Sequence, residues 1–537
     1  MVQWFTVAIL ALNLNTTSLT QAAREPVGEL FMTSDRCLAC HNGILSTTGH
    51  DASIGANWQA SMMAHASRDP YWQAAVRREC LEHPTAKAAI QNECSACHMP
   101  MSRYHAKANG KLGVVFDHLP IARAQTLAGQ LAADGVSCTL CHQISPEHLG
   151  EEESFTAGFV IDHEKPLGER AVYGPYDVDK GRTRVMQSSS LFVPTEKTHV
   201  QDSALCASCH TLYTHTLDEQ GKAIGQLPEQ VPYLEWQYSA YNDVQHCQAC
   251  HMPELPDPTP ISSVLGQARE NFSQHAFRGG NFFMPKILNR YWAELGVQAL
   301  PQDLDRMSRA TKDHLMSKSA RIAIQAAQRE GETLTVQIGL TSLAGHKLPT
   351  AYPSRRAWVS LHVTDSRGRT VFASGVLRGD GSITGNDNDR DATRFEPHYQ
   401  EITSADQVQI YEAVMVDPQD RVTTSLLAAL RYAKDNRLLP SGFDKAQVPA
   451  DIAVQGRAVN DADFRAAQDS VVYRLDVSDA QGPFHIRAEL YYQPIAYRWA
   501  HNLKQKNAVE IERFVNYYES MSQESAVVLA RAEGTVR

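Results

Sequence analysis

The amino-acid sequence predicts a protein of more than one domain, in which a mainly helical, loop-rich part precedes an antiparallel β-sandwich-like domain and a C-terminal helix. Three observations predict this. All 11 cysteines lie between Cys37 and Cys250. Several segments before about residue 330 have apolar residues at helix-like spacing and no strong alternation. From Thr333 onward, the pattern changes to alternation among β-branched residues, which is typical of strands.

Residues 1–23 are predicted to be a secretory signal peptide. An apolar run from Trp4 to Leu12 is followed by polar residues and by a small-residue cleavage site around Ala22 and Ala23. Because no Lys or Arg precedes the apolar run, an uncleaved anchor or a misassigned start is the alternative. No other stretch reaches the roughly 18 apolar residues that a membrane-crossing helix needs. We therefore expect an exported protein, periplasmic or extracellular.

Residues 24–285 are expected to form the helical domain. Within it, helices are predicted at Asn57–Ala66 and Tyr71–Cys80. Residues 286–330 are expected to be a helical connector, because apolar residues recur at helix-like spacing through Leu300–Arg329.

Residues 331–503 are expected to form the β-sandwich-like domain. Runs such as TLTVQIGLTSL and SVVYRLDV alternate in polarity, and the segments TDSRGRT and SDAQGPF stand between such runs as turns. Residues 504–537 are expected to form a closing helix, centred on Lys504–Ala532.

The composition excludes one class of partner. The chain is 43% hydrophobic and 20% charged, as in an ordinary globular protein, and its net charge is −10. This balance leaves no basic surface to replace the counterions of a phosphate backbone, so nucleic acid is not an expected partner.

One short motif occurs five times. The pattern C-x-x-C-H begins at Cys37, Cys94, Cys138, Cys206 and Cys247. With 11 cysteines and 22 histidines in 537 residues, chance would place about 0.01 copies in the chain. A zinc ribbon also uses cysteines two residues apart, but it needs no histidine after each pair, and five pairs would leave one without a partner. In an exported protein, the repeated motif is typical of covalent c-type haem attachment.

The spacing of the motif has a mechanical reason. The two thiols form thioethers with the two vinyl groups of the porphyrin, and the next imidazole is thereby delivered beneath the iron. We therefore expect five covalently bound c-type haems. The attaching residues are expected to be Cys37, Cys40, Cys94, Cys97, Cys138, Cys141, Cys206, Cys209, Cys247 and Cys250. The proximal iron ligands are expected to be His41, His98, His142, His210 and His251.

A haem that only transfers electrons usually has a second protein ligand, whereas an enzyme haem leaves that position open. The candidate distal ligands are His118, His199, His215, His275 and His346. His215 lies five residues after His210, too close to reach the other face of the same haem, so it would have to ligate a neighbouring one. His346 follows the first strand of the β domain and could reach back to a haem; His65 is a further candidate. Each could instead be a surface or hydrogen-bonded histidine.

Two other features have two interpretations each, and one cysteine lies outside the motifs. Arg355 and Arg356 could pair with haem propionates or form a solvated surface pair. The odd cysteine, Cys80, is expected to be a buried free thiol. The segment DGSITGNDNDRD could bind calcium or form an acidic turn, and its spacing does not match an EF-hand. The oxygen donors of that candidate calcium site are Asp387, Asn388, Asp389 and Asp391.

With these motifs, the first 285 or so residues resemble the multihaem c-type cytochromes of the cytochrome c554 type, distant relatives of hydroxylamine oxidoreductase and pentahaem nitrite reductase. The resemblance implies a helical, loop-rich domain with haems in stacked and perpendicular pairs, most of them with two histidine ligands. The stretch GHKLPTAYPSRRAW and the β region resemble C-terminal domains appended to other multihaem cytochromes. Ammonia-forming nitrite reductases have a C-x-x-C-K motif that is absent here, and hydroxylamine oxidoreductases carry more haems, so neither activity transfers.

The first hypothesis is an exported pentahaem electron-transfer cytochrome, whose β domain serves for docking or for shielding the haems. The alternatives are an oxidoreductase of nitrogen or sulfur compounds with one open haem, and a subunit of a conductive cytochrome assembly. The expected partners are redox proteins and other haem proteins, with membrane contact only through them, and a homo-oligomer under the third hypothesis.

Overall fold

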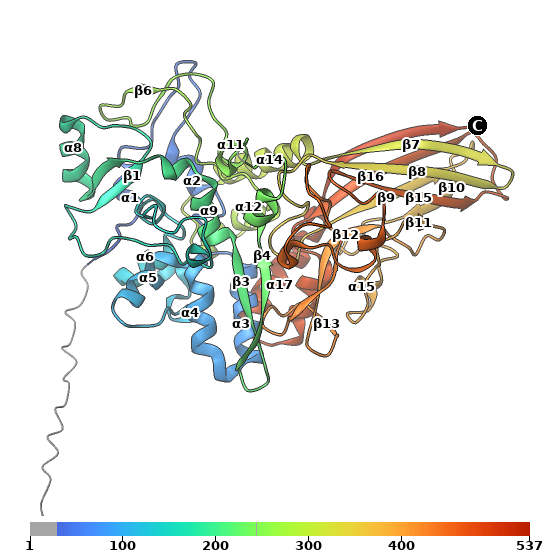
Figure 1. The fold of residues 1–537 in the computed structure, drawn as a ribbon, viewed down its shortest axis with the longest axis horizontal. Coiled ribbons are helices and arrows are strands. Elements are labelled where there is room, and N and C mark those ends of the chain that lie inside the picture. Colours follow the sequence, from blue (N-terminus) through green and yellow to red (C-terminus); the bar gives the residue numbers. More distant parts are fainter. Residues whose placement is uncertain (1–28, 243) are drawn as a thin grey trace, which may run out of the picture.

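The structure is a computed structural model, which describes residues 29–242 and 244–537. The predicted signal peptide, 1–23, lies outside the described residues. Helices and loops make up the N-terminal part, and long strands extend from it toward the C-terminus (Figure 1). No helix in the described part of the chain is long and apolar enough to span a bilayer.

Short helices joined by loops dominate the N-terminal part. They are α1 (Asp35–Leu38), α2 (Ile54–Gln59), α3 (Pro70–Glu82), α4 (Lys87–His98), α5 (Pro100–Ala108), α6 (Leu127–Ala133), α7 (Cys138–Cys141), α8 (Lys180–Ser190), α9 (Ser203–His210), α10 (Pro232–Gln237), α11 (Cys247–His251), α12 (Phe283–Arg290), α13 (Trp292–Leu295) and α14 (Pro301–Lys318).

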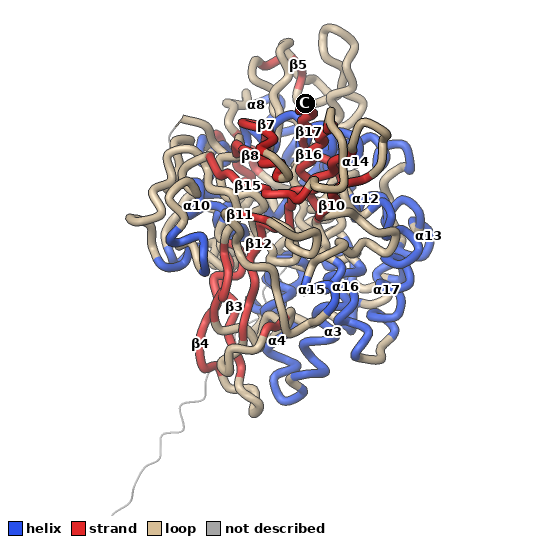
Figure 2. Tube along the Cα trace, turned by 90° about the vertical axis from the view of Figure 1, so that its right-hand side faces the viewer, coloured by secondary structure: helices blue, strands red, loops and turns tan. Residues whose placement is uncertain are grey.

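The sequence predicted a mainly helical, loop-rich part, and the structure adds strands to it. Three two-stranded sheets stand among the helices, and the β3–β4 hairpin forms a separate ribbon below the larger sheets (Figure 2). The strands are β1 (Ala171–Gly174), β2 (Val193–Glu196), β3 (Leu212–Leu217), β4 (Ala223–Gln230), β5 (Thr259–Pro260) and β6 (Ala268–Arg269).

The two helices predicted here have different outcomes. Tyr71–Cys80 lies within α3, which begins with Asp69 as N-cap and Pro70 in its first turn, so that helix is confirmed. Of Asn57–Ala66, only the first residues are helical, because α2 ends at Gln59. The Met63 carbonyl accepts a hydrogen bond from the Val136 N–H (3.0 Å), so a tertiary contact takes an acceptor that a longer helix would use.

Two sheets form the C-terminal part. The larger has the order β13-β12-β9-β16-β17, with β10 paired to β9 and β14 to β12; the smaller has the order β11-β15-β8-β7. Within these two sheets, the described strand pairs are antiparallel except β11 with β15. The strands are β7 (Ala320–Glu330), β8 (Thr333–Ser342), β9 (Arg356–Thr364), β10 (Thr370–Ser374), β11 (Glu401–Ile402), β12 (Ile410–Val416), β13 (Val422–Thr423), β14 (Arg431–Asp435), β15 (Gln468–Asp476), β16 (Phe484–Gln493) and β17 (Val527–Val536).

The two sheets share one hydrophobic core. Val336 and Ile338 of β8 in the smaller sheet, and Val359 and Leu361 of β9 in the larger, are fully buried in the same cluster. Alternate residues of each strand thus face inward, as the sequence alternation predicted. The packing agrees with the expected antiparallel β domain.

The predicted connector 286–330 is helical only in part. Helix α14 ends at Lys318, and Ala320–Glu330 is strand β7. Gly331, with φ +62°, begins the two-residue turn that folds β7 back along β8. Because this pairing runs the length of both strands, it outweighs the helix propensity of the Ala, Gln and Arg residues in β7.

The predicted closing helix 504–537 is likewise wrong in its second half. Helix α17 spans Val509–Met521, and Val527–Val536 is strand β17, which pairs with β16 at the edge of the larger sheet. The segment alternates in burial, so tertiary pairing again decides against the local helix propensity.

Helix α17 packs against α3 and joins the two parts. The rings of Tyr71 and Phe514 lie 5.0 Å apart, and Arg77 forms an ion pair with Glu510 at 2.8 Å. The main hydrophobic cluster includes residues of both helices and of both sheets. The β domain is therefore fixed to the helical part by a continuous core.

Candidate haem sites

The first four C-x-x-C-H motifs converge on one cavity of about 1110 Å³ in the N-terminal part. Seven motif cysteines line it: Cys37, Cys94, Cys97, Cys138, Cys141, Cys206 and Cys209. Four motif histidines line it too: His41, His98, His142 and His210. The fifth motif lies beside the fourth, because the Cys247 N–H donates to the Ser203 hydroxyl (3.0 Å) at the start of α9.

Short helices present the motifs. Helices α4 and α9 each end at a motif histidine, and α7 and α11 each begin at the first motif cysteine. Residues three apart on a helical turn lie on the same face, so both thiols of a motif face the same side. This is the geometry that two thioether bonds to one porphyrin require.

Four of the five motif histidines hold their ring in the same way. The Nδ1 atom donates to a backbone carbonyl, at 2.6, 2.9 and 2.6 Å for His41, His98 and His142. The acceptors, in the order His41, His98, His142 and His251, are Ile261, Ala66, Tyr173 and Arg278. A neutral imidazole that donates from Nδ1 has a free lone pair on Nε2, which is the atom that would bind iron.

Burial keeps these imidazoles neutral. It lowers the pKa of His98 and His210 to about 4, well below the ordinary value for histidine. The ring of His98 also stacks on Trp72, with centroids 4.4 Å apart. A histidine must be neutral to bind a metal, so the lowered pKa favours iron binding at neutral pH.

The thiols show which motifs are neighbours. A hydrogen bond from the adjoining thiol lowers the pKa of Cys37, Cys209 and Cys247. The partners, in the same order, are Cys138, Cys97 and Cys206. The first motif thus adjoins the third, and the fourth adjoins the second and fifth. The Cys209 charge also raises the pKa of Cys141, after burial, so the third and fourth motifs are close as well.

Two predicted distal histidines face a proximal one. The ring of His275 lies 6.3 Å from that of His142, and the ring of His346 lies 6.2 Å from that of His251, with interplanar angles of 22° and 12°. Two metal–imidazole bonds of about 2 Å each, with about 1.1 Å more from nitrogen to ring centre on each side, place axial rings roughly 6 Å apart. The spacing of both pairs therefore fits an iron between them.

The loop that presents His346 belongs to the β domain but is fixed to the helical part. The Lys347 N–H donates to Glu235 of α10 (3.1 Å), and the Lys347 ammonium pairs with Asp435 (2.7 Å). Arg437 pairs with both Asp435 and Glu235. All four charges are buried, and two cations balance two anions. Such a network holds the loop in one position.

His314 was not singled out from the sequence. Its ring lies 6.2 Å from that of His251, at 43°, and it comes from α14. Burial, and then the charge of His251, lower the pKa of His314 to about 4. The sequence analysis missed it because it lies beyond the cysteine-rich half, in a segment interpreted as a connector.

The other predicted distal histidines lie outside the cavity wall. His118 Nε2 is 3.1 Å from the Ser102 hydroxyl, and His199 Nε2 donates to the Ile144 carbonyl (2.9 Å). The His215 side chain is 53% exposed, with Nδ1 3.5 Å from Glu93. All three remain predictions. His65 is buried, and neither ring nitrogen has a hydrogen-bond partner in the described part of the chain, which fits a ligand role.

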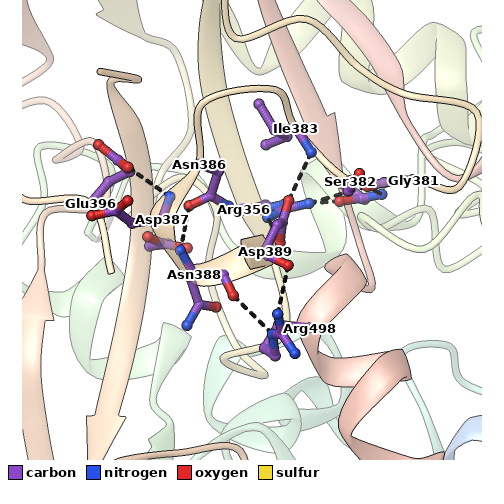
Figure 3. A network of polar contacts seen from close by, with 12 residues as sticks. Arg356, Gly381, Ser382, Ile383, Asn386, Asp387, Asn388, Asp389, Glu396 and Arg498 are labelled. Atoms are coloured by element: carbon purple, nitrogen blue, oxygen red, sulfur yellow. Dashed lines mark hydrogen bonds and ion pairs between the residues drawn. The ribbon is translucent and has the colours of Figure 1, made fainter. Parts of the chain in front are cut away.

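Arg356 and the predicted calcium segment form one network inside the β domain (Figure 3). Arg356 is 1% exposed and pairs with the Asp389 carboxylate at 2.8 Å, so it is neither a propionate partner nor a surface residue. Asp389 also accepts from the Ile383 N–H (2.7 Å), and Arg498 donates to the Asp389 carbonyl (2.6 Å).

This network favours the acidic-turn interpretation of the segment over the calcium site. Asp387 pairs with Arg394, and Asp391 accepts from the N–H and hydroxyl of Thr393. The oxygens of this segment bind guanidinium groups and local donors instead of converging on a common point, as calcium coordination requires.

No protein-family model and no curated protein matches the chain. A similar solved structure is the penta-heme cytochrome c552 from Thermochromatium tepidum, with 15% sequence identity and a TM-score of 0.54. The fold is that of a multihaem cytochrome c. The alignment covers 95% of this chain and 100% of that one, so the β domain belongs to the shared fold and is not an appendage to it. The resemblance to the cytochrome c554 type in particular stays a prediction.

Proposed function

We propose that the chain is an exported electron-transfer protein with five c-type haems, one at each C-x-x-C-H motif. The observation that carries the proposal is the convergence of the motifs: neighbouring thiols meet around one cavity, and four motif imidazoles are held by a carbonyl with Nε2 free. When bound, each haem would supply a one-electron iron couple. The fold shared with a penta-heme cytochrome supports this conclusion.

The contacts between motifs support a continuous path for electrons. The first motif adjoins the third, the third adjoins the fourth, and the fourth adjoins the second and fifth. An electron that enters near the first motif would thus pass to the third and then to the fourth, and from the fourth to the second and the fifth. Apolar residues in the cavity wall, among them Trp58, Trp72 and Phe272, exclude water and keep the local dielectric low.

The distal ligands proposed on geometry are His275 for the third motif and His346 for the fifth. An iron with two protein ligands does not bind small molecules, so these two sites would only transfer electrons. The partners would be redox proteins and other haem proteins of the periplasm or the cell exterior. A homo-oligomer, or a conductive assembly of such subunits, stays a prediction.

A second candidate function is an oxidoreductase with one open iron. Glu229 lines the cavity and is 6% exposed, and burial raises the pKa of its carboxyl to about 7. A carboxylic acid with that pKa can donate and accept protons at neutral pH, as a reductive reaction would need. Spin-state measurements distinguish the two functions, as set out at the end of the Discussion.

The first test is the number of haems per chain. The exported protein, made in a cell that attaches c-type haem, is expected to have the mass of the chain plus five haems. Replacing both cysteines of one motif by alanine should remove one haem, whereas the matched control Cys80→Ala should retain all five, because Cys80 is buried outside the motifs. A protein that carries zinc and no haem would contradict the proposal.

A further inference from the structure

Arg355 is the one lysine or arginine among the described residues that line the haem cavity. The wall otherwise contains six carboxylates: Asp69, Glu79, Glu93, Asp202, Glu229 and Glu254. His210 of the fourth motif lines the same wall as Arg355. Arg355 Nη1 also lies beside Gly280, two residues after Arg278, whose carbonyl accepts from His251 of the fifth motif. The guanidinium therefore lies near the imidazoles of the fourth and fifth motifs.

The direction of the Arg355 side chain follows from its place in the chain. Arg356 is the first residue of β9 and points into the β domain, where Asp389 and Gln493 bind it (Figure 3). Arg355 comes at the end of the turn before β9, and its side chain lines the haem cavity instead. The preceding Ser354 donates to the Pro494 carbonyl (2.8 Å), which fixes the backbone on the other side.

The Arg355 guanidinium has unused donors. It donates from Nη1 to the Thr350 carbonyl (3.0 Å), and it forms no ion pair within the described residues. A guanidinium has five N–H donors in a planar fork that matches the two oxygens of a carboxylate or another oxyanion. Gly280 lies beside the guanidinium: a Cβ there would lie 3.5 Å from Arg355 Nη1, an ordinary contact.

We propose that Arg355 binds an oxyanion in the cavity between the fourth and fifth motifs. The oxyanion is either the propionate carboxylate of a haem held there or a free oxyanion that enters the cavity. The inference rests on the proposed function, because only a chain that binds haem has a propionate at this place. Arg355 is the one cationic side chain among the described residues of the wall, so it is the position where the charge is complementary to an anion.

The experiment compares Arg355→Gln and Arg355→Lys with the matched control Arg367→Gln. Arg367 is exposed in the turn at the other end of β9, so its loss removes the same charge far from the cavity. Each protein is first checked for five haems by mass. A wild type that does not carry five haems would contradict the proposed function. The comparison of Arg355→Gln with the wild type would still test the role of Arg355, on the haems that are present.

Haem reduction potentials are then measured by optical titration, without and with sodium nitrite as the probe oxyanion. If a propionate is bound, Arg355→Gln leaves a negative charge uncompensated, and the reduced-to-oxidised ratio of one or two haems at a fixed potential falls at least tenfold, about 59 mV. Arg355→Lys recovers part of this fall in reduction potential, and Arg367→Gln leaves the potentials unchanged. If the oxyanion is free, nitrite shifts the wild-type spectrum and not that of Arg355→Gln. Equal potentials and equal nitrite responses in all four proteins would overturn the inference.

Discussion

Four of the five motif histidines depend on a second contact for their orientation. The Nδ1 atoms of His41 and His142 both donate to a carbonyl at 2.6 Å, which turns Nε2 toward the cavity. A ring held at one nitrogen loses little further freedom when the other binds iron. The candidate distal ligand His346 is held in the same way, by the Lys347 carbonyl (2.9 Å).

The first prediction separates the two imidazoles that face His251. His346→Ala is expected to convert one low-spin haem to a high-spin form that binds carbon monoxide, because the iron loses its second ligand. His314→Ala is the matched control, since the His314 ring lies at the same 6.2 Å from His251, and it should leave all haems low-spin. Electron paramagnetic resonance of both oxidised variants shows which one contains high-spin haem. High-spin haem in His314→Ala and not in His346→Ala would assign His314 as the ligand.

The second prediction concerns Glu229 and pH. Its folded-state pKa, raised to about 7 by burial, lies above the unfolded value, so the stability it contributes is present at low pH and lost as pH rises toward 7. Glu229→Gln keeps an acceptor for the Thr214 hydroxyl and should remove this loss, of up to about 3 kcal/mol. Melting temperatures at pH 5 and pH 8 test it, and an equal pH dependence in both proteins would refute it.

One buried cluster has the residue types of a metal site, but the nitrogen of its histidine that faces a carboxylate carries a proton. His398, Asp461 and Asp469 lie within reach of one ion. The His398 Nδ1 accepts from the side-chain amides of Gln409 and Asn436, both at 3.0 Å. The Nε2 atom must therefore hold the proton, which it donates to Asp461 (2.9 Å). A histidine in this state has no lone pair for a metal, so the cluster is a hydrogen-bonded polar core.

At the scale of elements, the loop with His346 is held by a buried ion network. Removing one partner of such a network leaves an uncompensated buried charge, so Lys347→Met is expected to destabilise the protein by about 3–5 kcal/mol. The exposed pair of Arg474 and Glu401 is the control, and Arg474→Met should cost less than about 1 kcal/mol. Chemical denaturation measures both. Equal, small losses would show that the network does not hold the loop.

The strands were predicted where alternation was strict and missed where the residues favour helices. The segment Thr333–Ser342 alternates in burial through β8, and its sequence pattern shows it. Ala320–Glu330 and Val527–Val536 are rich in Ala, Arg and Glu or Gln, and they become strands only because β8 and β16 offer a partner. Pairing between distant segments is a tertiary effect that local spacing does not reveal.

At the scale of the whole molecule, the sequence predicted the haem attachment and little of how the sites are completed. The motif spacing alone predicts the haem-attaching cysteines and the proximal histidines, and these roles stay predictions. The distal side depends on segments far along the chain: His275 faces His142, and His346 crosses from the β domain to His251. His314 follows from where α14 lies in space, which no local pattern records.

The central claim is that every iron is closed and that the molecule only transfers electrons. The most direct measurement is the low-temperature electron paramagnetic resonance spectrum of the oxidised, fully loaded protein, with optical spectra of the reduced protein under carbon monoxide. We predict low-spin signals only and no change on addition of carbon monoxide. A high-spin signal from one haem in five, together with carbon monoxide binding, would contradict the claim and favour an oxidoreductase with Glu229 as a proton donor.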